Sequence, residues 1–93
     1  MFAVYCLDKP QTAELRQATR PAHLAYIKVF ADNIALAGPI VSDDDESSLG
    51  GLLLVRFDSR AEAEAFIRDD PYTKAGLFDS ITVKRFRQVV PPP

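Results

Sequence analysis

The spacing of hydrophobic residues along the chain predicts four strands. Residues 2–7 are rich in the β-branched and aromatic side chains that favour strands. Residues 34–41 are also expected to form a strand, in which Gly38-Pro39 marks a bulge or an edge. Residues 50–57 are apolar almost without interruption, which is typical of a strand covered on both faces. A last strand is expected to carry Phe86 on one face and, on the other, Ile81, Val83 and Val89.

Residues 11–33 are expected to be helical, because their apolar side chains recur every three or four positions. Pro21 interrupts this pattern, because proline lacks the amide N–H and clashes with the preceding turn. We therefore expect two helices here. The first ends near Ala18, and the second is capped by Thr19 or Arg20 with Pro21 in its first turn.

A further helix is predicted after residue 59, where Ser59 and Glu62 match a capping box. It should end at Asp70, because a residue before proline is biased towards extended geometry. A short helical turn should then run from Pro71 to Gly76, where glycine favours termination.

The resulting order, β-α-β-β-α-β, predicts an α+β, ferredoxin-like domain: an antiparallel sheet with helices on one face. Helices on one face leave the other face of the apolar strand at 50–57 uncovered. We expect a second copy to cover it, which makes the protein a homodimer. The domain should span residues 1–90, followed by a disordered proline tail at residues 91–93.

Composition narrows the classes of partner. The chain has 93 residues and a formal charge of −2, so it lacks the basic surface that attracts nucleic acid or anionic lipid. RNA-recognition domains share this element order, but Leu52 and Leu54 stand where aromatic rings would stack on bases. No apolar run approaches the roughly 20 residues needed to span a membrane. Cys6 is the only cysteine, which favours a reducing, cytoplasmic location and a buried hydrophobic role.

One Asp and one His could form an acid/base pair. Asp70 stands at an expected helix start, where its carboxylate would accept the free N–H groups of the first turn. His23, the only histidine, lies just after Pro21, where the helix dipole favours neutral imidazole. We expect the two side chains to meet in a concave pocket, with His23 exchanging protons and Asp70 orienting it. Capping alone would also account for Asp70, and a lone helical histidine is often structural.

Three residues are weaker candidates for substrate binding. Tyr26 and Tyr72 lie close in sequence to the pair and could line the same pocket, or pack in the core with a polar tip. Arg20 could hold an anionic substrate, or be solvated. We expect no cofactor and no metal, since the acidic run at 43–46 is typical of a solvated loop and one His leaves few ligands.

Several segments together carry a family resemblance: residues 20–26, 37–39, 50–55, 69–72 and 75–77, which read Arg-Pro-Ala-His-Leu-Ala-Tyr, Ala-Gly-Pro, Gly-Gly-Leu-Leu-Leu-Val, Asp-Asp-Pro-Tyr and Ala-Gly-Leu. The chain resembles the YCII (YciI-like) domain family of the dimeric α/β-barrel superfamily. The resemblance implies a dimer formed through the open face of the sheet and a His–Asp site on His23 and Asp70. In the family, a small residue such as serine commonly follows the glycine that corresponds to Gly51. This chain has Leu52 there, so it lacks any hydroxyl group that the family contributes at this position.

Two functions follow as hypotheses. The first is a small cofactor-independent acid/base enzyme, similar to an isomerase or lyase, that acts on a small cyclic or carbonyl compound through His23 and Asp70. The alternative is a non-catalytic small-ligand-binding or accessory module of the same fold. The superfamily that the chain resembles includes isomerases, lyases and cofactor-free oxygenases built on the same fold. The fold alone therefore does not choose between these reactions.

Overall fold

Four strands form one antiparallel sheet in the computed structural model, which describes residues 1–93. The strands are β1 (Phe2–Asp8), β2 (Ile34–Val41), β3 (Ser48–Val55) and β4 (Phe78–Arg85). Their order across the sheet is β2-β3-β1-β4, so β1 pairs with β3 on one side and β4 on the other. Val4 in β1 lies opposite Leu53 of β3 and Val83 of β4. The predicted ferredoxin-like order is confirmed.

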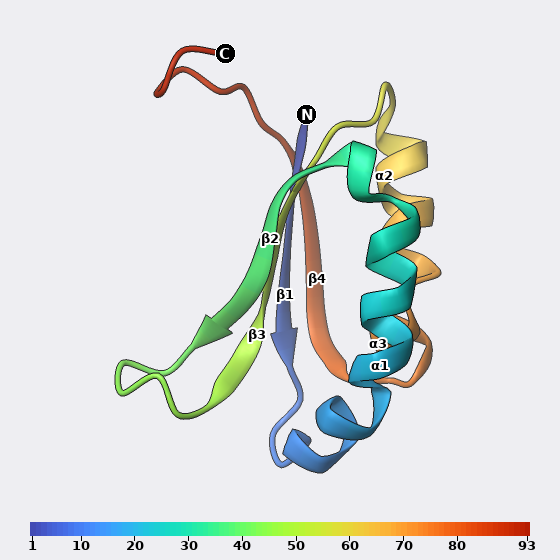
Figure 1. Cartoon of the computed structure of the whole chain (residues 1–93), viewed down its shortest axis with the longest axis vertical. Helices are drawn as coiled ribbons and strands as arrows, with labels where there is room; N and C mark the ends of the chain where they lie inside the picture. Colours follow the sequence, from blue (N-terminus) through green and yellow to red (C-terminus); the bar gives the residue numbers. More distant parts are fainter.

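The helices lie together on one face of the sheet (Figure 1), as predicted. They are α1 (Ala13–Val29), α2 (Arg60–Arg68) and α3 (Pro71–Lys74), and a short 3-10 turn, η1 (Ala31–Asn33), leads from α1 into β2. The core fills the space between the two layers, where burying apolar side chains stabilises the fold. Its buried members are Phe2, Val4, Cys6, Leu53, Val55, Ala63, Phe66 and Ile67.

The predicted break at Pro21 is wrong, because α1 runs without interruption from Ala13 to Val29 with Pro21 inside it. Proline removes one helical hydrogen bond, here the one to the carbonyl of Gln17, and strains that turn. Both residues are exposed, so water can solvate the freed carbonyl. Packing of the helix against the sheet and α3 therefore outweighs the local cost.

The two later helices follow their predicted caps. The hydroxyl of Ser59 accepts from the backbone N–H of Glu62 at 3.2 Å, and Asp70 caps α3 by accepting from the backbone N–H of Tyr72 at 2.9 Å. Gly76 has a φ of 78°, the left-handed conformation that glycine adopts readily after a helix. These local signals place Asp70 at the start of α3, as the sequence predicts.

The last strand is shorter than predicted. β4 ends at Arg85, so Phe86 and Val89 lie beyond it. The reason is pairing: Arg85 lies opposite Phe2, at the start of β1, and only the bond from the Phe86 N–H to the Met1 carbonyl follows. With no further partner strand, residues 86–93 do not extend the sheet.

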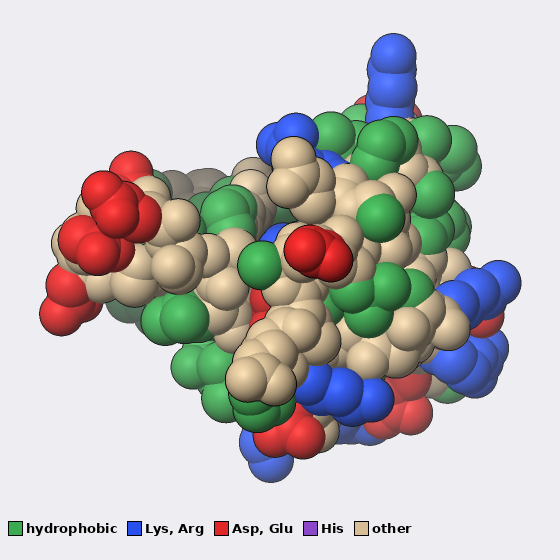
Figure 2. Space-filling model, turned by 90° about the horizontal axis from the view of Figure 1, so that it is seen from below, with side chains coloured by type: hydrophobic (Ala, Val, Ile, Leu, Met, Phe, Trp, Pro, Cys, Tyr) green, Lys and Arg blue, Asp and Glu red, His purple; other side chains and the backbone are tan.

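The face of the sheet opposite the helices is bare and apolar. Along β1, β2 and β3 it exposes Tyr5, Leu7, Leu36 and Leu52, each between 36% and 53% exposed. The β2–β3 loop projects beyond this face, and Figure 2 shows acidic side chains gathered on it, those of residues 43–46. None of the helices has the length and apolar character that crossing a membrane requires.

Candidate functional site

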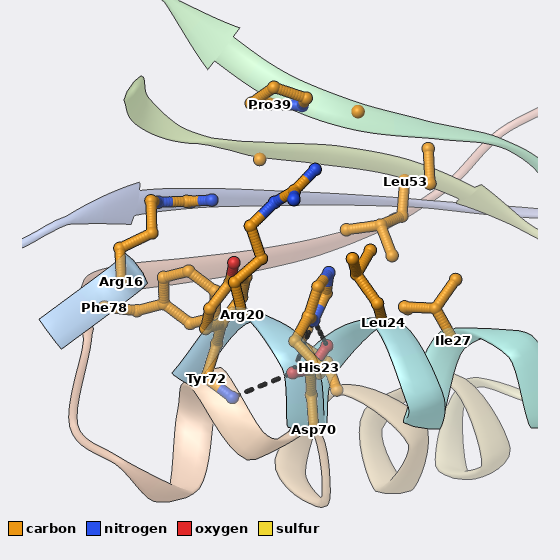
Figure 3. Close-up of a pocket in the computed structure, with 14 residues that line it drawn as sticks. Arg16, Arg20, His23, Leu24, Ile27, Pro39, Leu53, Asp70, Tyr72 and Phe78 are labelled. Carbon is orange, nitrogen blue, oxygen red and sulfur yellow. Dashed lines mark hydrogen bonds and ion pairs between the residues drawn. The ribbon is translucent and has the colours of Figure 1, made fainter. Parts of the chain in front are cut away.

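His23 and Asp70 meet across the helical layer, as the sequence predicts. Nδ1 of His23, in the middle of α1, lies 2.9 and 3.0 Å from the two carboxylate oxygens of Asp70. An ionised carboxylate can only accept hydrogen bonds, so Nδ1 carries the proton and donates it. The second ring nitrogen, Nε2, points away from Asp70 into a cavity (Figure 3), and in a neutral imidazole with the proton on Nδ1 it is the proton acceptor.

Asp70 is fixed from two sides. Its side chain is 1% exposed, and Oδ1 also accepts the Tyr72 N–H that begins α3. The cap thus holds the carboxylate in the orientation in which it meets the imidazole. The two roles considered for Asp70, capping and holding His23, are therefore performed by the same group. The helix-dipole effect expected at His23 does not apply, because it acts only at the first turn of a helix and α1 begins well before His23.

Tyr72 forms one wall beside the histidine. Its ring stacks on the His23 imidazole, with 4.0 Å between ring centroids and 17° between planes. Phe78 meets the Tyr72 ring edge-on at 6.1 Å. This packing restricts rotation of the imidazole, so Nε2 keeps its direction. The predicted placement of Tyr72 beside the pair agrees with this geometry.

The cavity in front of His23 has a volume of about 270 Å³ and lies between the helices and the sheet. It is lined by Arg16, Arg20, His23, Leu24, Ile27, Ala37, Gly38, Pro39, Gly51, Leu53, Ile67, Asp70, Tyr72 and Phe78. Small residues on β2 and β3 leave the space open: Ala37, Pro39 and Gly51 stand where longer side chains would reach the helices. The segment 37–39, noted in the sequence without a role, forms this floor together with Gly51.

Arg16 is a site residue that the sequence analysis missed. Its guanidinium donates to both oxygens of Asp8, at 2.8 and 3.1 Å, and to the Gly50 carbonyl at 3.0 Å, and it lies 4.7 Å from the centre of the Tyr72 ring. Arg16, Arg20 and His23 recur at steps of four and three, so they share one face of a continuous helix. That signal was present in the sequence, but the expected break at Pro21 concealed it.

Tyr26 does not reach the cavity, which corrects its assignment as a candidate for substrate binding. Its hydroxyl donates to the Phe66 carbonyl at 2.8 Å, and its ring packs against Phe30 and Phe66. Burial raises its pKa. These contacts hold Tyr26 against Phe66 of α2 rather than over the sheet floor. The alternative considered for it, core packing with a polar tip, describes it fully.

Cys6 is fully buried in the core, as expected of a small hydrophobic residue. Burial, with a smaller effect of the negative charge on Asp70, raises the pKa of its thiol to about 12. The thiolate needed for nucleophilic chemistry is therefore disfavoured. No three His, Cys, Asp or Glu side chains gather closely enough to hold a metal ion.

Comparison with known proteins gives these residues a family. The model of the YCII-related domain matches residues 1–87. The chain belongs to the YCII-related domain family. Among its relatives in this family is protein YciI of Escherichia coli, 31% identical over 96 residues that cover 96% of this chain and 98% of YciI.

Two further relatives carry more specific names. The derivative of benzaldehyde biosynthesis cluster protein C of Emericella nidulans is 34% identical over 83 residues, covering 77% of this chain and 85% of that protein. A solved structure, the 5-chloro-2-hydroxyhydroquinone dehydrochlorinase of Burkholderia phenoliruptrix in complex with 2,5-dihydroxybenzoquinone, superposes with a TM-score of 0.88. The two chains are 33% identical, and the superposition covers 95% of this YCII-related chain and 94% of the dehydrochlorinase chain.

Proposed function

We propose that the protein is a cofactor-independent acid/base enzyme, of the lyase or isomerase type, that acts on a small cyclic carbonyl or hydroxylated ring compound. The observation that carries this proposal is the geometry of His23. Nδ1 is held by both oxygens of a buried carboxylate, and Nε2 is left free towards a cavity of about 270 Å³. An oriented imidazole beside a small concave space is an arrangement suited to proton transfer.

In the proposed reaction, His23 Nε2 takes a proton from an acidic C–H or O–H beside a carbonyl group. The electron pair of the broken bond forms an enolate, or moves on to expel a leaving group from the adjacent atom. Asp70 stabilises the imidazolium through the Nδ1 hydrogen bond. Returning the proton to another substrate atom completes an isomerisation. Loss of the leaving group with its electron pair, followed by transfer of the proton to water, completes an elimination.

The relatives support this reaction class. The structural neighbour is named a dehydrochlorinase and was solved with a dihydroxybenzoquinone. Dehydrochlorination removes a proton and a chloride, which is the elimination described above. The relative from Emericella nidulans is named for a cluster that makes benzaldehyde derivatives, which are also small carbonyl-bearing rings. Both names favour a substrate of one ring.

Hydrogen exchange tests the proposal without knowledge of the natural substrate. In deuterated buffer, NMR follows loss of the acidic C–H signals in a panel of small cyclic ketones, cyclic diketones and hydroxyquinones. We expect the protein to accelerate exchange in at least one of them. His23→Gln should lower that rate by about a hundredfold or more, because general acid/base assistance is typically of that size.

Lys28→Gln provides the matched control, because Lys28 is exposed on the same helix and lies outside the cavity. Its exchange rate should equal that of the unchanged protein. If no compound exchanges faster than in buffer, or if His23→Gln leaves the rate intact, the enzyme proposal fails. Binding of these compounds without any exchange would instead favour the alternative, a small-ligand-binding or accessory module.

We also propose that the protein acts as a homodimer. The bare sheet face exposes Tyr5, Leu7, Leu36 and Leu52 next to one another across three strands. A contiguous apolar surface of this kind marks an interaction site on a soluble domain. Its flat, sheet-like shape suits a second copy of the same sheet, and sheets pack face to face through such side chains.

A further inference from the structure

The cavity has two chemically different ends, with His23 between them. In Figure 3, Arg16, Arg20 and Tyr72 lie on one side of the imidazole, whereas Leu24, Ile27 and Leu53 lie on the other. All six line the cavity. A ligand that spans the space must therefore be polar at one end and apolar at the other, with its middle beside Nε2.

The hydroxyl of Tyr72 is a hydrogen-bond donor at the polar end. Burial raises the pKa of this phenol, although the positive charges of Arg16 and Arg20 oppose the effect, so the hydroxyl keeps its proton at neutral pH. The guanidinium of Arg16 lies 4.7 Å from the centre of the Tyr72 ring, and a guanidinium can only donate hydrogen bonds, so it cannot accept the phenol proton. The proton of Tyr72 is therefore free to be donated to a ligand.

Arg20 supplies an uncompensated positive charge. The four ion pairs of the structure involve Arg16, His23, Arg60 and Arg68, and they leave Arg20 without a carboxylate partner. Arg16, one turn earlier, is balanced by Asp8 and fixed by the Gly50 carbonyl. An oxygen atom that accepts from Tyr72 would thus stand in the field of both guanidinium groups, which favours negative charge on it.

We propose that Tyr72 and Arg20 form a subsite for an anionic oxygen, so that the substrate is a small ring bearing an acidic hydroxyl, as an enolate or phenolate. This inference rests on the proposed acid/base function, because it places that oxygen at one end of the ring and the reacting atom beside His23 Nε2. The apolar end at Leu24, Ile27 and Leu53 takes the remainder of the ring. Ligand pockets for drug-sized molecules are generally about 300–1,000 Å³, so a cavity of about 270 Å³ suits one ring.

A pair of matched ring compounds tests the subsite by binding alone. The first is 4-nitrophenol in mildly alkaline buffer, where it is mostly the phenolate; the second is 4-nitroanisole, in which a methyl group replaces the acidic proton. We expect the phenolate to bind at least about tenfold more tightly, because hydrogen bonds to charged groups are the stronger ones. Equilibrium dialysis with absorbance detection measures both compounds.

Variants assign the preference to its residues. Tyr72→Phe keeps the ring that stacks on His23, and should weaken phenolate binding by about tenfold to a hundredfold while leaving the methyl ether unchanged. Arg20→Gln should also weaken the phenolate and reduce the sensitivity of binding to salt. Arg68→Gln, at an exposed position of α2, serves as the control and should leave the affinity for both compounds unchanged.

His23→Gln separates this inference from the proposed function. It should retain the preference for phenolate, since the subsite does not include the imidazole, while losing hydrogen exchange. Equal binding of the two compounds, or a Tyr72→Phe variant that is folded by circular dichroism and binds phenolate like the unchanged protein, would overturn the subsite. Exchange by the unchanged protein would then still stand on its own evidence.

Discussion

At the scale of single residues, Asp70 connects folding with the candidate chemistry. One carboxylate, 1% exposed, caps α3 and holds the imidazole of His23. We expect Asp70→Ala to lower the free energy of unfolding by about 1–3 kcal/mol, through the lost cap and the unpaired Nδ1–H. Urea denaturation measures the free energy of unfolding.

Asp69→Ala is the matched control. The exposed side chain of Asp69 caps no helix, so this substitution should alter the free energy of unfolding by no more than about 0.5 kcal/mol. Equal effects of the two substitutions would contradict the double role.

At the scale of elements, the continuity of α1 decides which side chains share the cavity. Arg16 and Arg20 precede Pro21 and His23 follows it, yet all three lie on one face of a single helix. A proline inside a helix costs about 3 kcal/mol relative to alanine, offset in part by the flexibility that alanine adds to the unfolded chain. We therefore expect Pro21→Ala to raise the free energy of unfolding by about 1–3 kcal/mol.

Urea denaturation measures this change as well, with Pro10→Ala as the comparison because Pro10 lies in the loop before α1. That substitution removes no strain from a helix, and should leave stability unchanged or slightly lower. A loss of stability in Pro21→Ala would indicate that a separate helix begins at Pro21. If Pro21→Ala lowered stability, Pro21 would behave as the first residue of a separate helix, where proline is favourable, and a continuous α1 would be contradicted.

At the scale of the whole molecule, the sheet has one face covered by helices and one bare (Figure 1). We expect Leu52→Glu to convert the proposed homodimer into a folded monomer, because burying an unpaired carboxylate against an apolar partner is strongly unfavourable. Sedimentation equilibrium measures the mass, and circular dichroism confirms the fold. Val29→Glu, at a position 79% exposed at the end of α1, should remain dimeric. A dimer that persists in Leu52→Glu would place the interface elsewhere.

The sequence by itself determined the parts of this protein that depend on near neighbours. The Ser59 cap and the Asp70–Pro71 step are local, because the backbone senses residues only a few positions away, and these predictions are confirmed. The four strands were also predicted, but β3 spans Ser48–Val55 rather than 50–57 and β4 ends at Arg85, before Phe86 and Val89. The His23–Asp70 approach was also foreseen, with the help of a family resemblance. Only the tertiary structure decided whether α1 bridges Pro21, since packing against the sheet and α3 outweighs a local penalty. It likewise turned Tyr26 into the core and brought Arg16 and the small residues of β2 and β3 together around one cavity, because the cavity is formed by side chains from segments far apart in the chain.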